Sequence, residues 1–483
     1  MLTAVGLAWL VCAVIAVAVA RRTRAWLRLR HIPGPFSAGF SELWLIMKTR
    51  GGRVHMETAE ACERYGSIVR IGPNELITSD PDVLRRMLNT KSPYRRSNWY
   101  DALRIDPSHD NVLSERDNEK HSVLRSKMAA GYSGKENEHL ELSIDENIAN
   151  LIRLLEAKYL STDTIYNPVD FAQKAQFLTL DVISDIAFGK AFGYLDTDDD
   201  VFSYIKTTED TVPVMILVGA LPWLSQIIQS RLLKSLMPSD KDIYGLGRVM
   251  GVAKRVVSER FGPDKKIQKD MLGSFVNHGL TQREAESETL MQILAGSDTT
   301  ASAMRATLLH ISTSPRVLNR LLSEIASTPI SSPITDAEAR KMPYLQAVIK
   351  EGLRIFPPVT GLMFKDVPAG GDTLNGYYVP ENTKLGYCAF GLMLDTNLWG
   401  PDAKLFRPER WFEGSAEDIR RKESNLDLVF GYGRWQCLGK SVAQIELNKV
   451  FVEVCYPVSL RTVTARFSIF TKSSNEAPKE ARP

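Results

Sequence analysis

The first long feature of the hydropathy pattern is an uncharged apolar run over residues 2–20. As a helix it spans about 28 Å, which matches the hydrocarbon thickness of a bilayer. Five arginines follow at once: Arg21, Arg22, Arg24, Arg28 and Arg30. Such a bias keeps the downstream chain cytoplasmic. The alternative is a cleaved signal peptide, because Ala18-Val19-Ala20 could serve as a cleavage site. We expect a transmembrane anchor over 1–20 and a basic, proline-rich linker over 21–37.

The pattern beyond the linker alternates between short strand-like runs and longer helical stretches. Residues 66–77 indicate a β-hairpin, because two β-branched runs flank a Gly-Pro turn. Residues 178–195 are typical of a core helix closed by a glycine. Residues 212–224 are apolar, but they are too few and too interrupted by proline for a second span. They fit either a surface segment that dips into a membrane or a buried loop.

The longest helical stretch begins at Thr281, which forms a capping box with Glu284. No proline follows until Pro315, so the helix could run about 50 Å. Its middle carries Ala295-Gly296-Ser297-Asp298-Thr299-Thr300, most of them poor interior helix formers. An exposed polar turn is the simplest interpretation, but apolar side chains lie directly beside it. We therefore expect a functional kink or groove at this point.

Composition and charge narrow the range of functions that the sequence predicts. The chain has 483 residues, 44% of them hydrophobic, which is ample for a large core. Its net charge of only +3 does not indicate a nucleic-acid partner. The cysteines are scattered and odd in number: Cys12, Cys62, Cys388, Cys437 and Cys455. A disulfide framework or a structural zinc site is therefore not expected.

One of these cysteines stands in a chemically distinctive place. Cys437 follows a glycine-rich turn and precedes a helical run that begins at Lys440. The glycines let the backbone approach a flat object closely, and N–H groups at a helix start favour thiolate over thiol. Such a thiolate suits an axial ligand to haem iron. The spacing alone equally fits a buried structural cysteine.

Two charged pairs at helical spacing are ambiguous by themselves. Glu351 and Arg354 are i and i+3 partners on a helix that Pro343 opens. His121 and Arg125 are i and i+4 partners on a helix predicted over 119–130. The first pair could be an ordinary surface ion pair, and the second could be an exposed basic face.

Four stretches resolve these ambiguities together, because they occur in the order typical of the cytochrome P450 family. They are A-G-x-D-T-T at 295–300, E-x-x-R at 351–354, P-E-R-W at 408–411 and F-x-x-G-x-x-x-C-x-G at 430–439. Over about residues 32–455 the chain resembles this family. Residues 95–99, 131–136 and 439–440 look most like those of fungal members active in secondary metabolism and aromatic hydroxylation.

The resemblance implies a mostly α fold with small β-sheets: a single large helical domain over 38–483 behind an N-terminal transmembrane anchor. It implies haem b as cofactor, with the Cys437 thiolate as axial ligand of the iron. It also implies cofactor contacts at Phe430, Gly433, Arg434, Gly439, His121, Arg125 and Lys365. Here His121 takes the place of the family's usual aromatic residue beside the haem propionate.

The resemblance also assigns roles to the remaining motif residues. Thr299 would hold a water near the iron and Asp298 would relay protons, the needs of oxygen activation. Glu351, Arg354 and Arg410 would form a buried structural triad that braces the cysteine loop.

Two departures from the family pattern stand out. The arginine expected two residues before the cysteine is Trp435, with Arg434 one place earlier, so propionate binding there is expected to be shifted or lost. From about residue 456 the C-terminus does not match the hairpin that usually closes the substrate pocket. We expect 475–483 to be a disordered tail, and a truncated or alternatively spliced chain would put activity in question.

The sequence therefore predicts a haem-thiolate monooxygenase acting on a small apolar or aromatic substrate at the endoplasmic reticulum membrane, with its domain in the cytoplasm. Electrons would come from NADPH through a separate cytochrome P450 reductase, with cytochrome b5 as a further candidate donor, since no nicotinamide-binding motif is evident. The alternatives are a haem-thiolate isomerase or dehydratase that uses no oxygen, and an inactive haem-binding protein.

Overall fold

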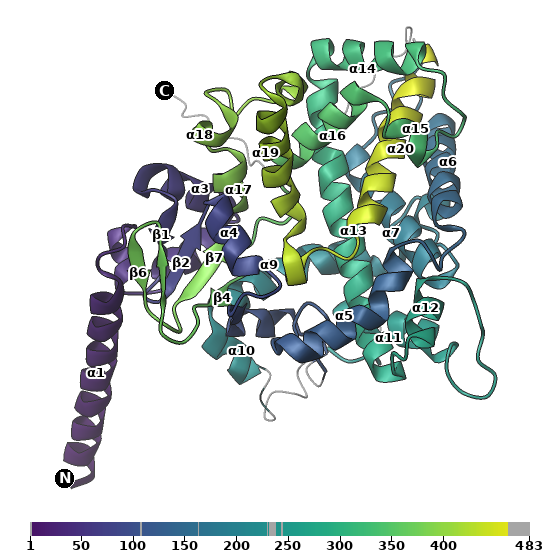
Figure 1. Cartoon of the computed structure of the whole chain (residues 1–483). Coiled ribbons are helices and arrows are strands. Elements are labelled where there is room, and N and C mark those ends of the chain that lie inside the picture. Colours follow the sequence, from purple (N-terminus) through teal and green to yellow (C-terminus); the bar gives the residue numbers. More distant parts are fainter. Residues whose placement is uncertain are drawn as a thin grey trace, which may run out of the picture.

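A computed structural model describes residues 2–106, 109–162, 164–228, 230, 238–242 and 245–461. This part of the chain is mostly helical with two small sheets, as the sequence predicts. The helices form one large body, and the sheets lie at the side from which the N-terminal helix emerges (Figure 1). The expected disordered tail over 475–483 falls outside the described residues.

The elements follow the chain in this order. The α-helices are α1 (Leu2–Leu29), α2 (Leu43–Arg50), α3 (Val54–Tyr65), α4 (Pro81–Leu88), α5 (Asn118–Tyr132), α6 (Leu140–Lys158), α7 (Phe171–Phe188), α8 (Tyr194–Thr197), α9 (Tyr204–Ala220), α10 (Pro222–Ile228), α11 (Gly245–Ser258), α12 (Met271–Asn277), α13 (Gln282–Ser312), α14 (Pro315–Ser327), α15 (Asp336–Ala339), α16 (Pro343–Ile355), α17 (Ala389–Met393), α18 (Thr396–Trp399), α19 (Ala416–Leu426) and α20 (Lys440–Arg461). Short 3-10 turns are η1 (Phe36–Gly39), η2 (Asn98–Leu103), η3 (Val201–Ser203), η5 (Pro408–Phe412), η6 (Asp427–Phe430) and η7 (Gly433–Trp435).

The larger sheet joins distant parts of the chain. Its strand order is β1 (Ile68–Arg70), β2 (Glu75–Thr78), β7 (Lys384–Tyr387), β4 (Lys365–Asp366) and β3 (Arg95–Arg96). Strands β1 and β2 form the predicted antiparallel hairpin, with Val69 opposite Ile77. Strand β7 then pairs with β2 in parallel and with β4 in antiparallel orientation. A separate hairpin pairs β5 (Asp372–Leu374) with β6 (Tyr377–Val379).

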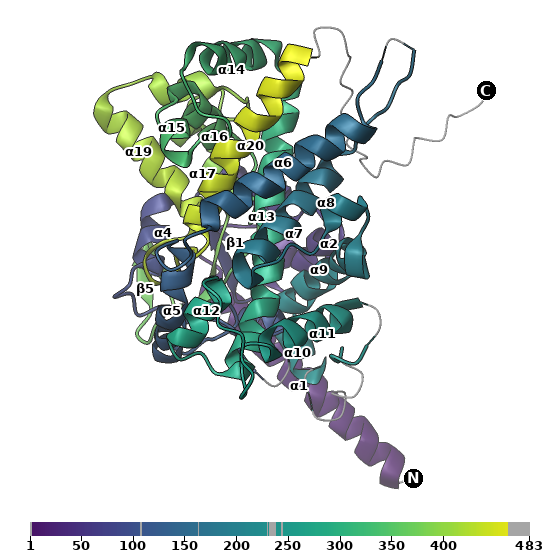
Figure 2. The ribbon, with the colours of Figure 1, turned by 90° about the vertical axis from the view of Figure 1, so that its right-hand side faces the viewer.

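Helix α13 is the central element of the helical body. Thr281 caps it, and Glu284 completes the predicted capping box by accepting from the backbone N–H of Thr281. It packs against α7, α11 and α16, and two views show it crossing the body (Figures 1 and 2). It is helical without a break through the Gly296 motif, where the sequence predicts a kink or a groove. The Thr299 hydroxyl donates to the carbonyl of Ala295 four residues back.

Helix α1 contains the apolar run over 2–20 and continues to Leu29, beyond the arginines. It extends away from the body, and its C-terminal end is held by contacts such as the 2.7 Å ion pair of Arg22 with Glu42 (Figure 1). Within the described part of the chain, no single helix is long and apolar enough to span a bilayer. By length and composition one bent pair could do so, Val201–Ala220 with Pro222–Ile228, bent by 117°.

A buried charge network joins α16 to the segment that leads to the cysteine loop. Arg354 donates from Nε and Nη2 to both carboxylate oxygens of Glu351, at 2.9 and 2.8 Å, and both side chains are fully buried. Arg410 in η5 donates to Glu351 at 2.9 Å, and Trp411 donates at 3.1 Å. Arg354 also donates to the carbonyl of Met393, which ends α17. The network therefore holds α16, α17 and η5 in one arrangement.

Replacing Glu351 by Ala should lower the free energy of unfolding by about 3–5 kcal/mol, because it leaves the buried guanidinium of Arg354 without a carboxylate and leaves Arg410 with Asp402 alone. Denaturant titration of the purified protein measures this loss. Glu423→Ala is a matched control, since Glu423 pairs with Lys350 of the same helix α16 at the surface. That control should cost at most about 1 kcal/mol. Equal losses in both variants would contradict a structural role for the triad.

Candidate active site

The cysteine loop, residues 430–439, is closed by its own backbone. The N–H of Cys437 donates to the carbonyl of Phe430 at 2.7 Å, which brings the two ends of the loop together. Gly431 and Gly433 both have positive φ, and a Cβ on Gly433 would lie 2.6 Å from the carbonyl oxygen of Leu88. This close approach to the end of α4 requires glycine. Lys440 then pairs with Asp427 at 2.9 Å across the loop.

The Cys437 side chain is accessible within a recess, whereas Cys62, Cys388 and Cys455 are buried. Protein atoms crowd the thiol on its other sides, and this desolvation raises its pKa. The backbone N–H groups of Gly439 and Lys440 and the charge of Arg125 act in the opposite direction. A side chain on Gly439 would come within 3.9 Å of the sulfur. The geometry thus leaves one sulfur open to a ligand. Burial disfavours its anion, and the N–H groups and Arg125 offset part of that effect.

A cluster of basic side chains lies beside the loop and gathers around Trp435. The His121 ring lies 4.5 Å from the Trp435 ring, centroid to centroid. Lys365 Nζ stands 3.5 Å from the Trp435 ring centroid and Arg96 Cζ stands 4.3 Å from it. Arg434 instead donates to the carbonyl of Thr90 at 2.6 Å. The structure therefore brings the predicted residues His121 and Lys365 together.

Burial dominates the titration of this cluster. It lowers the pKa of Lys365 well below its ordinary value, and the neighbouring charges of Arg96 and Arg434 lower it further. Desolvation, together with repulsion from neighbouring basic side chains such as Arg96 and Arg125, lowers the pKa of His121 to about 2. This imidazole is therefore neutral. Arg125 is half-buried, and burial lowers its pKa as well. Such a site favours an anionic ligand.

Arg96 belongs to this cluster, although the sequence reasoning assigned it no role. Its Nη1 donates to the carbonyls of Val112 and Glu115, and burial lowers its pKa to about 10. The turn residues and aromatics over 91–110 are typical of a long functional loop. Its pairing with β4, which joins positions 269 residues apart, is not visible in a local pattern.

Asp298 and Thr299 lie on different sides of α13. Asp298 accepts from Gln176 of α7 at 2.5 Å, and Arg305 donates to the same Gln176 at 2.7 Å. Desolvation raises the pKa of Asp298 to about 6, although these polar partners oppose the shift. Thr299 is half-buried and lies one turn after Ala295, which is exposed in the middle of the helix. Adjacent residues are about 100° apart around a helix, which explains the two directions.

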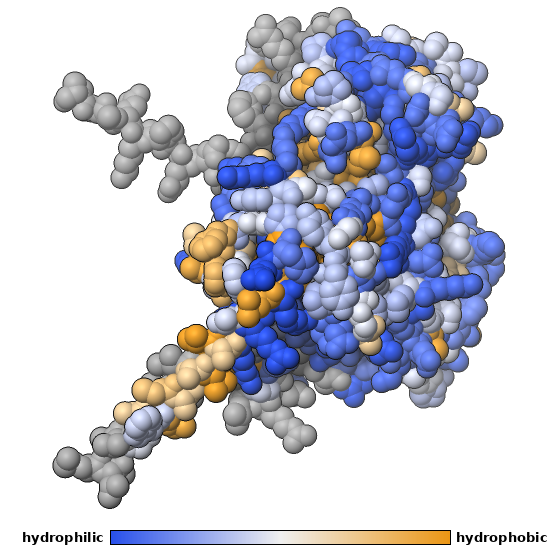
Figure 3. Space-filling model, turned by 60° about the vertical axis from the view of Figure 1, so that its left-hand side comes forward, coloured by the Kyte–Doolittle hydropathy of each residue, from blue (hydrophilic) through white to orange (hydrophobic). Residues whose placement is uncertain are grey.

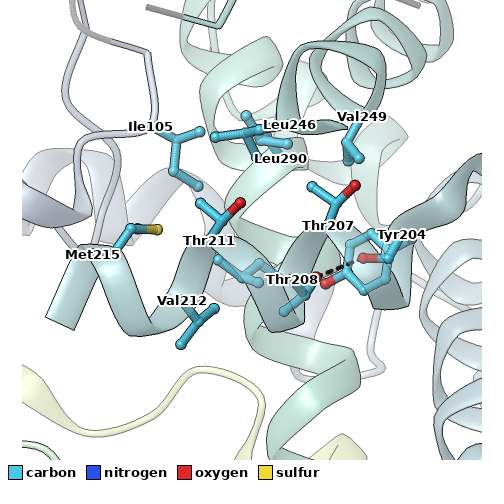
Figure 4. Close-up of a pocket in the computed structure, with 11 residues that line it drawn as sticks. Ile105, Tyr204, Thr207, Thr208, Thr211, Val212, Met215, Leu246, Val249 and Leu290 are labelled. Carbon is cyan, nitrogen blue, oxygen red and sulfur yellow. Dashed lines mark hydrogen bonds between the residues drawn. The ribbon is translucent and has the colours of Figure 1, made fainter. Parts of the chain in front are cut away.

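A small pocket lies further along α13 and is mostly apolar (Figure 4). It is lined by Leu290 and Leu294 of α13, Leu246 and Val249 of α11, Ile105, and one side of α9 from Tyr204 to Met215. The Tyr204 hydroxyl lies 3.2 Å from that of Ser297, next to Asp298. The pocket therefore adjoins the polar motif in the middle of the helix.

Comparison with known proteins agrees with this geometry. The family model for cytochrome P450 matches residues 33–455. Cytochrome P450 monooxygenase ABA1 of Pyricularia oryzae is 44% identical over 93% of this chain and 90% of its own length. Cytochrome P450 monooxygenase aba1 of Botryotinia fuckeliana is 39% identical over 90% of this chain and 87% of its own length. Cytochrome P450 monooxygenase abl1 of Leptosphaeria maculans is 38% identical over 89% of this chain and 77% of its own length.

The chain belongs to the cytochrome P450 family and is an oxidoreductase of the monooxygenase class. The predicted resemblance to fungal members is confirmed. This family implies a haem held by a cysteine thiolate. The residues present fit that group, because Cys437 offers an open sulfur and the cluster around Trp435 offers buried cations to its carboxylates. Gly433 lets the loop backbone lie close to the end of α4.

Proposed function

We propose that this protein inserts one oxygen atom from O2 into a small apolar or aromatic substrate, as a member of fungal secondary metabolism. The observation that carries the proposal is the polar pair on α13: a carboxyl with a pKa near neutral and a hydroxyl on the open side of the same helix. An isomerase or dehydratase of the same fold has no need of such a pair. When bound, the haem would supply dioxygen activation and electron transfer.

Asp298 would hold and pass the protons. A group with a pKa near the working pH both binds and releases a proton readily, and Asp298 meets this condition with a pKa of about 6. Its contacts with Gln176 and, through that amide, Arg305 keep the carboxyl on the α7 side of the helix. Thr299 would keep a water in place on the open side, about 100° around the helix from Asp298. Its hydroxyl oxygen still has a free lone pair after donating to Ala295.

The substrate and the electron donor follow from the surroundings of this pair. The lining of the adjoining pocket is mostly aliphatic, which supports an apolar substrate. Electrons would come from NADPH through a separate reductase, with cytochrome b5 as a further candidate, because the sequence shows no nicotinamide-binding glycine motif.

Replacing Thr299 by Ala should uncouple the reaction. The variant should keep its haem, bind substrate and consume NADPH, but release much of the reducing power as peroxide, because the water that carries protons loses its partner. The measurement is the ratio of product formed to NADPH consumed, with peroxide assayed alongside. A substrate for this assay comes from comparing the metabolites of a host with and without the chain.

Asp298→Asn is the companion variant. Only the protonated carboxyl can deliver a proton, so the wild-type rate should fall as the pH rises through about 6. The asparagine variant should be slow and should lack this inflection. An unchanged ratio of product to NADPH in Thr299→Ala would remove Thr299 from the mechanism. Product formed at the wild-type rate by both variants would favour the isomerase or dehydratase instead.

We also propose that the protein sits on the endoplasmic reticulum membrane through α1 and the α9–α10 region. Large apolar side chains are exposed on both: Leu7, Trp9, Leu10, Val17 and Val19 on α1, and Val214, Trp223 and Ile227 on α9 and α10. Figure 3 shows apolar residues along α1 and around its base. Exposed apolar surface of this extent supports contact with lipid, and the arginines after residue 20 favour a cytoplasmic domain.

Deleting residues 1–30 should release most of the protein from membranes while its haem is retained. Flotation with microsomes, followed by an absorbance spectrum of each fraction, measures both properties. Any residual binding should disappear when Trp223→Ser and Ile227→Ser are added, since both side chains are exposed on α10. A mature N-terminus processed after Ala20 would overturn the anchor and support a signal peptide.

A further inference from the structure

Arg96 and Lys365 form an unusual cross-strand pair. They stand directly opposite each other where β3 pairs with β4 in antiparallel orientation. Both side chains are at least nine-tenths buried, with 5% and 1% of their surface exposed. Like charges directly opposite one another destabilise a sheet, and burial increases the penalty. Something other than the pairing of the strands must therefore compensate these two charges.

In the described part of the chain, three buried nitrogen atoms of this cluster have no hydrogen-bond partner, which shows that the protein alone does not compensate these charges. Among the residues that the structure describes, Lys365 Nζ and Arg96 Nε are buried without a hydrogen-bond partner. His121 Nδ1 is buried in the same condition. Buried polar atoms are almost always paired in folded proteins, so three orphans in one cluster indicate a ligand that is part of the finished molecule.

Trp435 is the feature that these groups share. Lys365, Arg96 and His121 all contact its indole, at 3.5, 4.3 and 4.5 Å from the ring centroid. Tyr100 adds a second aromatic ring, 4.7 Å from Arg96 Cζ and 5.0 Å from Lys365 Nζ. The electron-rich face of an aromatic ring attracts cations, most strongly for tryptophan and where water is excluded. The indole thus offsets part of the repulsion between the two cations.

We infer that Trp435 is a positioning residue that holds Arg96 and Lys365 together as a carboxylate-binding pair, in place of the arginine that the family motif has at this position. The inference rests on the haem binding of the proposed function, since the carboxylates are the two propionates of the haem. The charge that the loop lacks at residue 435 is supplied by β3 and β4. The lowered pKa of Lys365 agrees with this role, because an anion beside it would restore its charge.

An arginine at position 435 should consequently be harmful in this chain. It would remove the aromatic face and add a further cation to Arg96, Lys365 and the nearby Arg434. Restoring the family residue should therefore weaken haem binding here, which is the opposite of what the motif alone suggests.

The test is the rate at which the haem-loaded protein loses haem to an excess of apomyoglobin. Trp435→Leu should lose haem about tenfold faster than the wild type, because contacts with two buried cations disappear. Trp435→Phe keeps an aromatic face and should stay within about threefold. Trp435→Arg should lose haem at least as fast as the leucine variant. Tyr166→Leu, at an exposed tyrosine between α6 and α7, is the control and should behave as wild type.

A double-mutant cycle separates positioning from simple packing. Lys365→Met removes the charge at similar volume, and in that background Trp435→Leu should have a much smaller effect than in the wild type. The red-shifted Soret band of the reduced carbon monoxide complex, read on the remaining loaded protein, should persist in every variant, since the sulfur ligand is untouched.

The inference is overturned if Trp435→Arg holds haem as tightly as the wild type, if Trp435→Leu changes nothing, or if its effect is the same with and without Lys365. These results would leave the monooxygenase proposal intact. A wild-type chain that binds no haem would overturn both.

Discussion

The hydrogen-bonded carboxylate of Glu351 is the contact on which the position of the site depends. Arg354, Arg410, Trp411 and the backbone N–H of Arg407 all donate to it, and no water is needed to satisfy it. Through these donors it fixes α16 against the segment that continues into α19 and the cysteine loop. A buried carboxylate with so many donors is stable only in one arrangement of those segments, so it specifies the arrangement.

The basic cluster at Trp435 is the opposite case. Here the buried Arg96 and Lys365 make no ion pair with a carboxylate among the described residues, although Glu115 and Glu288 act on Arg96 from a longer distance. Lys365 Nζ, Arg96 Nε and a ring nitrogen of the neutral His121 remain without hydrogen-bond partners. Burial with partners makes the Glu351 network a structural brace, whereas burial without partners makes the Trp435 cluster a place for an anion. The open sulfur of Cys437 lies at the same loop. The loop thus offers the Cys437 sulfur as a ligand, and the basic cluster at Trp435 offers positive charge to an anion bound beside it.

Local sequence patterns predicted most of the fold that surrounds the site. The capping box at Thr281, the hairpin of β1 and β2 and the glycine that ends α7 each depend on a few neighbouring residues, and each is found in the structure. The motif residues Glu351, Arg354 and Arg410 also come together, because their residue types match a family pattern. Helix α13 stays unbroken through the Gly296 motif, since tertiary packing on α7 and α11 outweighs the weak helix propensity of that motif.

Long-range pairing could not be predicted in this way. Arg96 becomes part of the site only because β3 meets β4, and the meaning of Trp435 depends on that meeting. The segment over 212–224 was expected as a membrane-dipping surface or a buried loop. It forms the end of α9 and the start of α10, and one side of α9 lines the pocket. Such roles arise from contacts between distant segments, and the hydrophobic pattern within one segment does not reveal them.

The absorbance spectrum of the reduced carbon monoxide complex tests the central claim, that Cys437 is the thiolate ligand of a haem. The wild type should show the red-shifted Soret band of thiolate-ligated haem, and Cys437→His should lose it. Cys388→Ser and Cys455→Ser should keep the band, because both thiols are buried away from the loop. A band that survives in Cys437→His, or that disappears in either serine variant with the fold intact, would contradict the account.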